Sequence, residues 1–98
     1  MEVVEMVKNK VVREGVAGTE GKMDLMVSVS PGEGGLQVEV EGKDVEFFGE
    51  DIKRVVVETL KGMGIESARV KVVEKTPLDF TIRARVRAAA LRAMGVEE

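Results

Sequence analysis

The segment "VAGTEGKMDLMVSVSP", residues 16–31, has the pattern of a β-hairpin. Its second half alternates in the way of a strand with one buried face. One side carries Leu25, Val27 and Val29, and the other carries Met26, Ser28 and Ser30. Between the two strands, Glu20, Gly21 and Lys22 form a polar tip with no typical reactive group. The sequence therefore predicts an exposed hairpin tip whose purpose its own residues leave open.

Two more strands and a helix are predicted downstream of the hairpin. Residues 36–41 alternate apolar with mostly acidic side chains, and residues 68–74 alternate apolar with mostly basic ones. Between them, "FFGEDIKRVVVETLKGMGI" has an apolar side at helical spacing. That side consists of Phe48, Ile52, Val55, Val56, Thr59, Leu60 and Met63. Gly64 is expected to end this helix in a left-handed conformation, with Ile65 folding back on its last turn.

The segment "TPLDFTIRARVRAAALRAMG", residues 76–95, predicts a second helix. Thr76 has the position of an N-cap, Pro77 that of the first helical residue, and Asp79 lies in the first turn. Gly95 is expected to end the helix. The expected core side carries Leu78, Ile82, Val86, Ala89 and Ala93.

The order of elements is β-β-β-α-β-α, which predicts an α+β fold. We expect a two-layer sandwich with a mostly antiparallel sheet and both helices on one face. Because the polar sides of residues 36–41 and 68–74 have opposite charge, these two strands are predicted neighbours, with Glu39 or Glu41 near Arg69 or Lys71. Residues 16–98 form the expected domain, and residues 1–15 are expected to be an arm or a short helix.

Composition excludes several functions. The chain has 98 residues, no Cys and no His, which removes disulfides, most nucleophile–base pairs and nearly all transition-metal sites. A net charge of −3 argues against nucleic acid as the partner. No apolar run reaches the ~18 residues that a membrane helix needs, and no secretory signal is evident, so a cytoplasmic protein is expected. Glu50 and Asp51 are interpreted as acids in the first turn of a helix rather than as a catalytic pair.

The last helix carries arginines on both sides of a second apolar ridge. Arg83 and Arg87 flank it on one side, and Arg85 and Arg92 on the other. The ridge itself consists of Phe80, Ala84, Ala88 and Leu91. This pattern suits a solvated helix face or a protein docking surface, where arginine is enriched; nucleic-acid binding is a third, weaker reading because no aromatic stacking platform accompanies it. If a partner docks here, the candidate residues are Phe80, Arg83, Arg87 and Leu91.

Three segments together resemble the acyl carrier subunit, or γ chain, of citrate lyase. They are "VAGT" followed by Asp24 and "LMVSVSP", then "FFGEDIKRVVVETLKGMGI", then "ARVKVVEKTPLDFTIRARVRAAALRA". The resemblance covers about residues 16–93, and the δ subunit of malonate decarboxylase is a weaker match. It implies a non-catalytic carrier subunit.

In that family, a hairpin serine bears a phosphoribosyl-dephospho-CoA arm through a phosphodiester, which makes the carrier a phosphoprotein. The thiol of this prosthetic group holds acetyl. The implied partners are the α subunit, a transferase that exchanges acetyl for citryl, the β subunit, a lyase that cleaves the citryl thioester, and the arm-transferring enzyme.

The tip departs from the family at one position. The family hairpin reads Ala-Gly-Thr-Leu-Glu-Ser-Ser/Gly-Asp, and the same span here runs from Ala17 to Asp24 with Lys22 at the serine position. An amine cannot form the phosphodiester; Thr19 is three residues early and Ser28 lies inside the next strand. Three explanations stay open: a redesigned chain, a natural paralogue that keeps a docking role, or a different alignment of the tip. The alternative function is accordingly an interaction or redesigned scaffold domain with an Arg-flanked docking helix.

Overall fold

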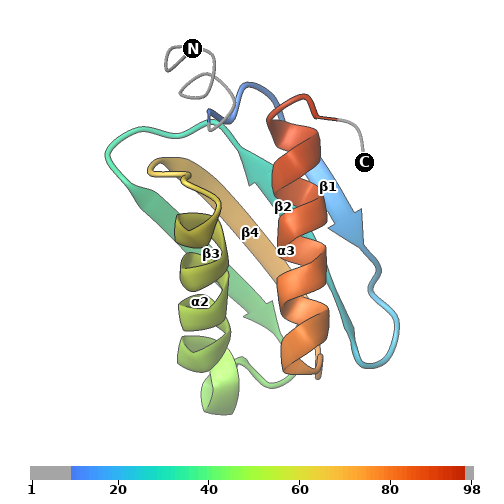
Figure 1. Ribbon diagram of the computed structural model, residues 1–98. Coiled ribbons are helices and arrows are strands. Elements are labelled where there is room, and N and C mark those ends of the chain that lie inside the picture. The colour runs from blue at the N-terminus through green and yellow to red at the C-terminus, as the bar shows by residue number, and fades with distance from the viewer. Residues whose placement is uncertain (1–9, 97–98) are drawn as a thin grey trace.

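The computed structural model describes residues 10–96, and it confirms the α+β architecture and the predicted order of elements (Figure 1). The strands are β1 (Gly15–Gly18), β2 (Asp24–Ser30), β3 (Leu36–Gly42) and β4 (Ala68–Lys75). The helices are α2 (Val45–Gly62) and α3 (Asp79–Ala93), and both cover the same face of the sheet. The expected arm or helix at 1–15 falls mostly outside the described residues; residues 10–14 are not helical, and β1 begins one residue before the expected start.

The sheet has the strand order β1-β2-β4-β3. The β1–β2 and β2–β4 pairs are antiparallel, whereas β3 and β4 are parallel because α2 connects them as a crossover. The predicted pairing of the acidic and basic strands is confirmed: Glu39 lies opposite Lys71, and Lys71 Nζ is 3.7 Å from Glu41 Oε1. Both side chains of this ion pair are more than half exposed, so it contributes only about 0–1 kcal/mol to stability.

The core lies between the sheet and the two helices. It is built from the inward side chains of the strands, which alternate with polar ones on the open face, and from one side of each helix. The largest contributions come from Leu25, Val27, Val29, Val70, Val72, Val56, Leu60, Ile65 and Val86. On α3 the buried side is narrow and rich in alanine, with Ala89, Ala90 and Ala93 against β1 and β2. Ala90 is a core position that the predicted helix face lacked.

Helix α2 begins earlier and ends as predicted. It starts at Val45, so Glu50 and Asp51 lie in its second turn and not in its first, which corrects the prediction. At the other end, Gly64 has φ +81° and the Ile65 N–H donates to the Leu60 carbonyl at 3.0 Å. This is the expected fold-back after a left-handed residue.

The predicted start of α3 is wrong. The helix begins at Asp79 with Leu78 as its N-cap residue, and Pro77 precedes it. Thr76 does not cap the helix, because its hydroxyl donates to Asp44 Oδ2 in the β3–α2 turn and its N–H donates to Glu74 Oε1. Leu78 is exposed and does not belong to the core side. Gly95 ends the helix in a left-handed conformation, as predicted.

Candidate functional site

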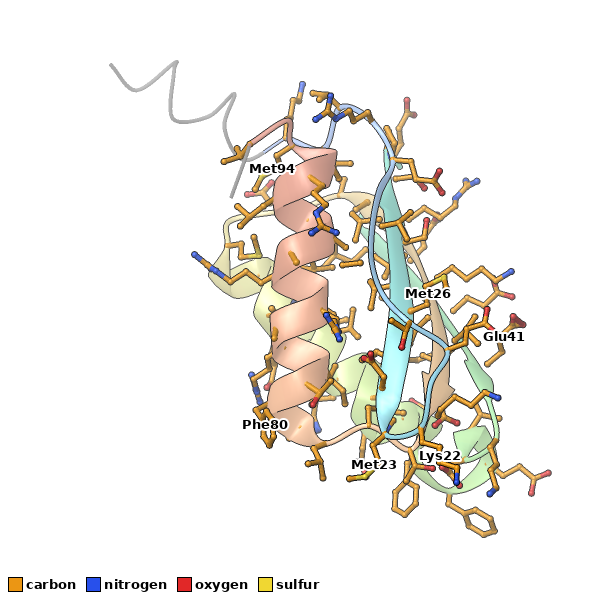
Figure 2. The ribbon with its side chains drawn as sticks, turned by 90° about the vertical axis from the view of Figure 1, so that its right-hand side faces the viewer. Lys22, Met23, Met26, Glu41, Phe80 and Met94 are labelled. Atoms are coloured by element: carbon orange, nitrogen blue, oxygen red, sulfur yellow. The ribbon has the colours of Figure 1, made fainter. Side chains whose placement is uncertain are left out.

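Three chain reversals and the first turns of both helices meet at one end of the molecule, which we call the tip end (Figure 1). The reversals are the hairpin tip at 19–23, the β3–α2 turn at 43–44 and the β4–α3 turn at 76–78. Figure 2 shows Lys22, Met23 and Phe80 at this end, whereas Met94 lies at the opposite end. Residues that are distant in sequence are therefore presented together at the tip end.

The hairpin tip has a fixed local geometry. Gly18 has φ +98°, and a Cβ there would lie 1.9 Å from the Leu25 carbonyl oxygen, so only glycine fits. The Thr19 hydroxyl accepts the N–H of Gly21 at 3.1 Å and donates to Asp24 Oδ2 at 2.8 Å. Met23 has φ +61°, and its N–H donates to the Lys75 carbonyl at 2.7 Å. These bonds fix the backbone and leave Glu20, Gly21 and Lys22 exposed.

A bidentate ion pair attaches the base of the tip to α3. Arg85 Nε lies 3.0 Å from Asp24 Oδ1, and Arg85 Nη2 lies 2.8 Å from Asp24 Oδ2. The hydrogen bonds from Arg85 are the main cause that lowers the pKa of Asp24 from 3.8 to about 2, against the opposing effect of burial. Of the arginines predicted to flank the apolar ridge, Arg85 thus holds the hairpin in place.

A buried carboxylate joins the other two reversals. Glu74 is 0% exposed, and its oxygens accept the N–H of Asp44 and the N–H of Thr76. Gly42 makes room for it, since a Cβ at this residue would lie 2.7 Å from Glu74 Oε2. Sequence reasoning missed Glu74, although the alternation of β4 after Val72 places it on the core side.

Apolar side chains gather at the tip end. The three Phe of the chain are all exposed there, Phe47 at 77%, Phe48 at 53% and Phe80 at 70%, together with Met23 and Leu78. Phe48, predicted on the apolar side of this helix, lies in the first turn of α2 and is not among the buried residues of that helix. Exposed aromatic residues grouped in this way are typical of a protein docking surface.

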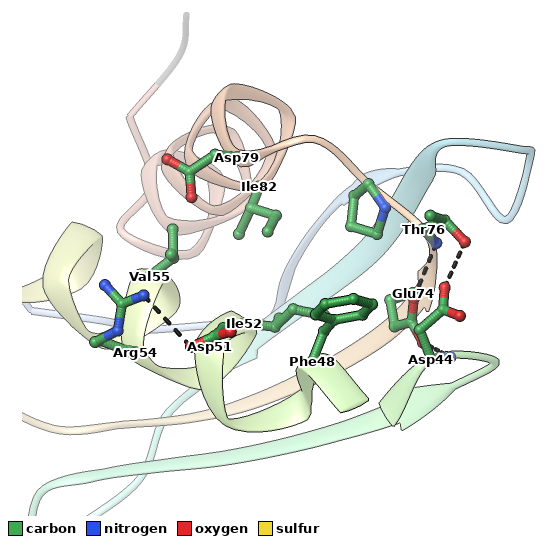
Figure 3. Close-up of a pocket in the computed structure, with 11 residues that line it drawn as sticks. Asp44, Phe48, Asp51, Ile52, Arg54, Val55, Glu74, Thr76, Asp79 and Ile82 are labelled. Carbon is green, nitrogen blue, oxygen red and sulfur yellow. Dashed lines mark hydrogen bonds and ion pairs between the residues drawn. The ribbon is translucent and has the colours of Figure 1, made fainter. Parts of the chain in front are cut away.

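A hollow beside the tip, which we call the lysine hollow, is lined by Lys22, Lys43, Lys75, Met23 and Thr76. None of its three lysines forms an ion pair with another residue of the range 10–96, whereas Lys53, Lys71 and several arginines do. Thr76 also lines a second, more apolar hollow between the helices. Figure 3 shows Phe48 and Ile52 from α2 and Ile82 from α3 around this second hollow.

The predicted docking residues lie along α3. Phe80 is at the tip end (Figure 2), and Leu91 is half-buried further along the helix. Arg83 is in ion pairs with Asp79 at 3.0 Å and Glu58 at 3.5 Å. Hydrogen bonding to Asp79 is the main cause that raises the pKa of Arg83. Arg87 borders a groove between α2 and α3 together with Arg83. A docking role for these residues stays a prediction.

The described part of the chain has neither a metal-binding cluster nor a membrane-spanning helix. Within residues 10–96, no group of three or more acidic residues is arranged to hold a metal ion. Over the same residues, no helix combines the length and the apolar character needed to cross a membrane.

The fold and its tip end define a small α+β sandwich domain that presents an exposed hairpin held by hydrogen bonds. Comparison with known proteins identifies the family. Residues 12–93 match the family described as "Malonate decarboxylase delta subunit (MdcD)". The citrate lyase acyl carrier protein of Pectobacterium atrosepticum is 44% identical over 84 residues, which cover 86% of this chain and 88% of that protein. The citrate lyase acyl carrier protein of Lactobacillus helveticus is 37% identical over 83 residues, covering 85% and 86% respectively.

The chain therefore belongs to this family of acyl carrier proteins, and it is a carrier subunit rather than a catalytic enzyme. A solved structure has the same fold: a chain from "Crystal structure of a Pseudomonas malonate decarboxylase hetero-tetramer in complex with malonate" superposes with a TM-score of 0.66 at 16% identity. The superposition covers 85% of this chain and 86% of that one. The resemblance stated from the sequence is confirmed at the level of the family.

Proposed function

We propose that this protein is the acyl carrier subunit of a cytoplasmic, citrate-lyase-type complex, in which it presents acetyl and citryl thioesters to the transferase (α) and lyase (β) subunits. The observation that carries the proposal is the exposed, hydrogen-bonded tip at an end of the molecule that also exposes apolar side chains. A carrier needs both features, because the acyl group must reach more than one partner while the protein stays oriented on the complex.

The geometry of the tip supports its alignment with the family hairpin. Met23 has a left-handed backbone conformation. The family has Ser or Gly at this position, and Gly adopts a left-handed conformation without strain. Gly18, Thr19 and Asp24 match the family and form the network that fixes the tip. These points favour an ungapped alignment, which puts Lys22 at the position of the family's serine.

The phosphoribosyl-dephospho-CoA arm does not fit residue 22. A phosphodiester needs a hydroxyl oxygen from the protein, and Lys22 offers a nitrogen. Thr19 is a poor substitute, because its hydroxyl already accepts the N–H of Gly21 and donates to the Asp24 carboxylate. When bound, the arm would supply the thiol that carries the acyl group; this chain supplies the scaffold and the docking surface.

The alternative is an interaction or redesigned scaffold domain that keeps the docking surface and bears no arm. The observation that favours it is Lys22 itself. Both functions use the surface around Phe80, which is 70% exposed at the start of α3. They differ in the partner, so binding to citrate lyase subunits separates them.

Binding to purified α and β subunits of citrate lyase from the same source tests the proposal. Size-exclusion chromatography should show this chain in a complex with them. Replacing Phe80 by Ser should weaken that complex at least tenfold, because aromatic residues dominate the binding energy of docking surfaces. Val12→Ser, at an exposed apolar residue outside the tip end, is the matched control. If the wild-type chain does not bind while an established carrier does, the interaction-domain alternative replaces this proposal.

A further inference from the structure

A phosphodiester between this chain and any arm requires a hydroxyl group of a Ser, Thr or Tyr side chain. The chain has no Tyr, and its Ser and Thr residues all lie in the described range; they are Thr19, Ser28, Ser30, Thr59, Ser67, Thr76 and Thr81. The question is which of them lies where the family serine would be.

Most of these hydroxyls are in the wrong place. Thr59 donates to the Val55 carbonyl inside α2. Thr81 lies in the first turn of α3, but it is half-buried and does not line the lysine hollow. Ser28 and Ser30 lie on the open face of the sheet, where they bond to Glu14 and to the Arg69 carbonyl. Ser67 precedes β4 at the end opposite the tip and accepts the N–H of Gly35. The Thr19 hydroxyl both accepts the N–H of Gly21 and donates to Asp24, and it does not line the lysine hollow.

Thr76 is the exception, because it lines the lysine hollow together with Lys22. The two residues are distant in sequence, yet the β4–α3 turn brings the threonine beside the family's attachment position. Thr76 is exposed, so its hydroxyl is accessible. Residue 22 lacks a hydroxyl group, but Thr76 provides one in the same hollow from a different turn of the chain.

The surroundings of Thr76 suit a phosphate-transfer acceptor. Its hydroxyl donates to Asp44 Oδ2, a carboxylate that can take up the proton (Figure 3). Lys22, Lys43 and Lys75 are free of ion pairs within residues 10–96 and line the same hollow, so their positive charge is available to phosphate oxygens.

The backbone of Thr76 is a second, independent observation. Thr76 has φ +55°, a left-handed conformation that is rare and strained for a β-branched residue. Glycine would adopt it without strain, and the N–H bond to Glu74 needs no side chain. Turn formation alone therefore does not call for a threonine at residue 76, whereas a use of its hydroxyl does.

We propose, on the basis of the carrier function proposed above, that Thr76 Oγ1 is the attachment atom of this chain. In the step, Thr76 Oγ1 attacks the phosphorus that joins the sugar of the activated arm precursor to its phosphoric anhydride, so this phosphorus stays bonded to the arm. An Oγ–P bond forms, the bond from that phosphorus to the bridging anhydride oxygen breaks, and phosphate or diphosphate leaves. The hydroxyl proton goes to Asp44. The result is the phosphodiester that the family serine makes, moved from the hairpin to the neighbouring turn.

Intact-mass and peptide-mapping spectrometry after incubation with the family's arm-transferring enzyme and arm precursor tests the assignment. Wild type and Thr76→Ser should gain the mass of one arm on the peptide that contains residue 76. Thr76→Gly should gain nothing; it suits the left-handed backbone, and an unchanged circular dichroism spectrum would show that it folds. Ser28→Ala, which removes a hydroxyl on the open face, should load like wild type.

Three results would overturn the assignment: loading of Thr76→Gly, an arm mapped to another residue, or no loading of the wild type while an established carrier is loaded in parallel. Failure here is distinct from failure of the proposed function. A chain that binds the citrate lyase subunits but acquires no arm keeps its place in the complex and loses the Thr76 assignment.

Discussion

Asp24 and Glu74 both hold the tip end together, yet their surroundings differ. Asp24 lies at the base of the hairpin, partly exposed, and pairs with the Arg85 guanidinium. Glu74 is fully buried, and the bonds that its oxygens accept come from backbone N–H groups of two different turns. The first carboxylate positions one loop against a helix, and the second joins two connections of the fold. We therefore expect a graded response to substitution, largest at Glu74 and smallest at the exposed tip.

Glu74→Ala should have the largest effect. It leaves the N–H groups of Asp44 and Thr76 without their acceptor and opens a space beside Gly42. Because each unsatisfied donor costs about 1–3 kcal/mol, we expect a loss of about 2–4 kcal/mol in the free energy of unfolding. Urea denaturation followed by circular dichroism measures it.

Glu74→Gln is the matched control for shape. Its amide keeps one acceptor oxygen but turns an NH₂ group toward the second N–H, so an intermediate loss is expected. If alanine costs less than about 1 kcal/mol, water replaces the carboxylate and Glu74 does not organise the tip end.

Asp24→Asn should have a smaller effect that depends on pH. The folded pKa of Asp24, about 2, is below its usual 3.8, so its stabilisation is present above pH 3.8 and is lost as the pH falls toward 2. Because Arg85 is about 40% exposed, solvent screens the pair and we expect about 1–2 kcal/mol at neutral pH. Urea denaturation at a series of pH values should show wild type and variant converging near pH 2.

Asp79→Asn is the control for this comparison. Asp79 also pairs with an arginine, Arg83, but both side chains are about half exposed or more, so the expected loss is at most about 0.5 kcal/mol. If the free energies of unfolding of Asp24→Asn and wild type differ by the same amount at every pH down to 2, the pair with Arg85 does not determine how acid destabilises the protein.

Much of the fold could be predicted because the strands alternate strictly and both helices end in glycine. Complementary charge even identified the neighbours β3 and β4. The errors concentrate at the tip end, for a physical reason. "TPLD" has the composition of a helix start, but Thr76 bonds instead to Asp44 and lies next to Glu74, residues that only the folded chain brings near. Likewise, helical periodicity placed Phe48 on the apolar side of α2 but could not show that the first turn of this helix is exposed.

Lys22→Ser has the smallest expected effect on stability and the sharpest on chemistry. Lys22 is exposed and forms no hydrogen bond or ion pair with another residue of 10–96, so the free energy of unfolding should change by no more than about 0.5 kcal/mol. The substitution restores the family's hydroxyl on a tip whose backbone is already fixed by Gly18, Thr19 and Asp24. Combined with Thr76→Gly, it should therefore accept one arm at residue 22.

The double variant tests separately whether the transferring enzyme recognises the shape of this tip and which residue must carry the acceptor hydroxyl. If Thr76→Gly alone gains no arm and the double variant gains one at residue 22, the transferring enzyme recognises this tip, and the hydroxyl is interchangeable between two turns that line one hollow. If the double variant gains nothing while an established carrier is loaded, the enzyme does not recognise the tip even with its serine restored. The likeness to the arm-bearing relatives then ends at the fold, and a docking role without an arm becomes the better account of the tip end.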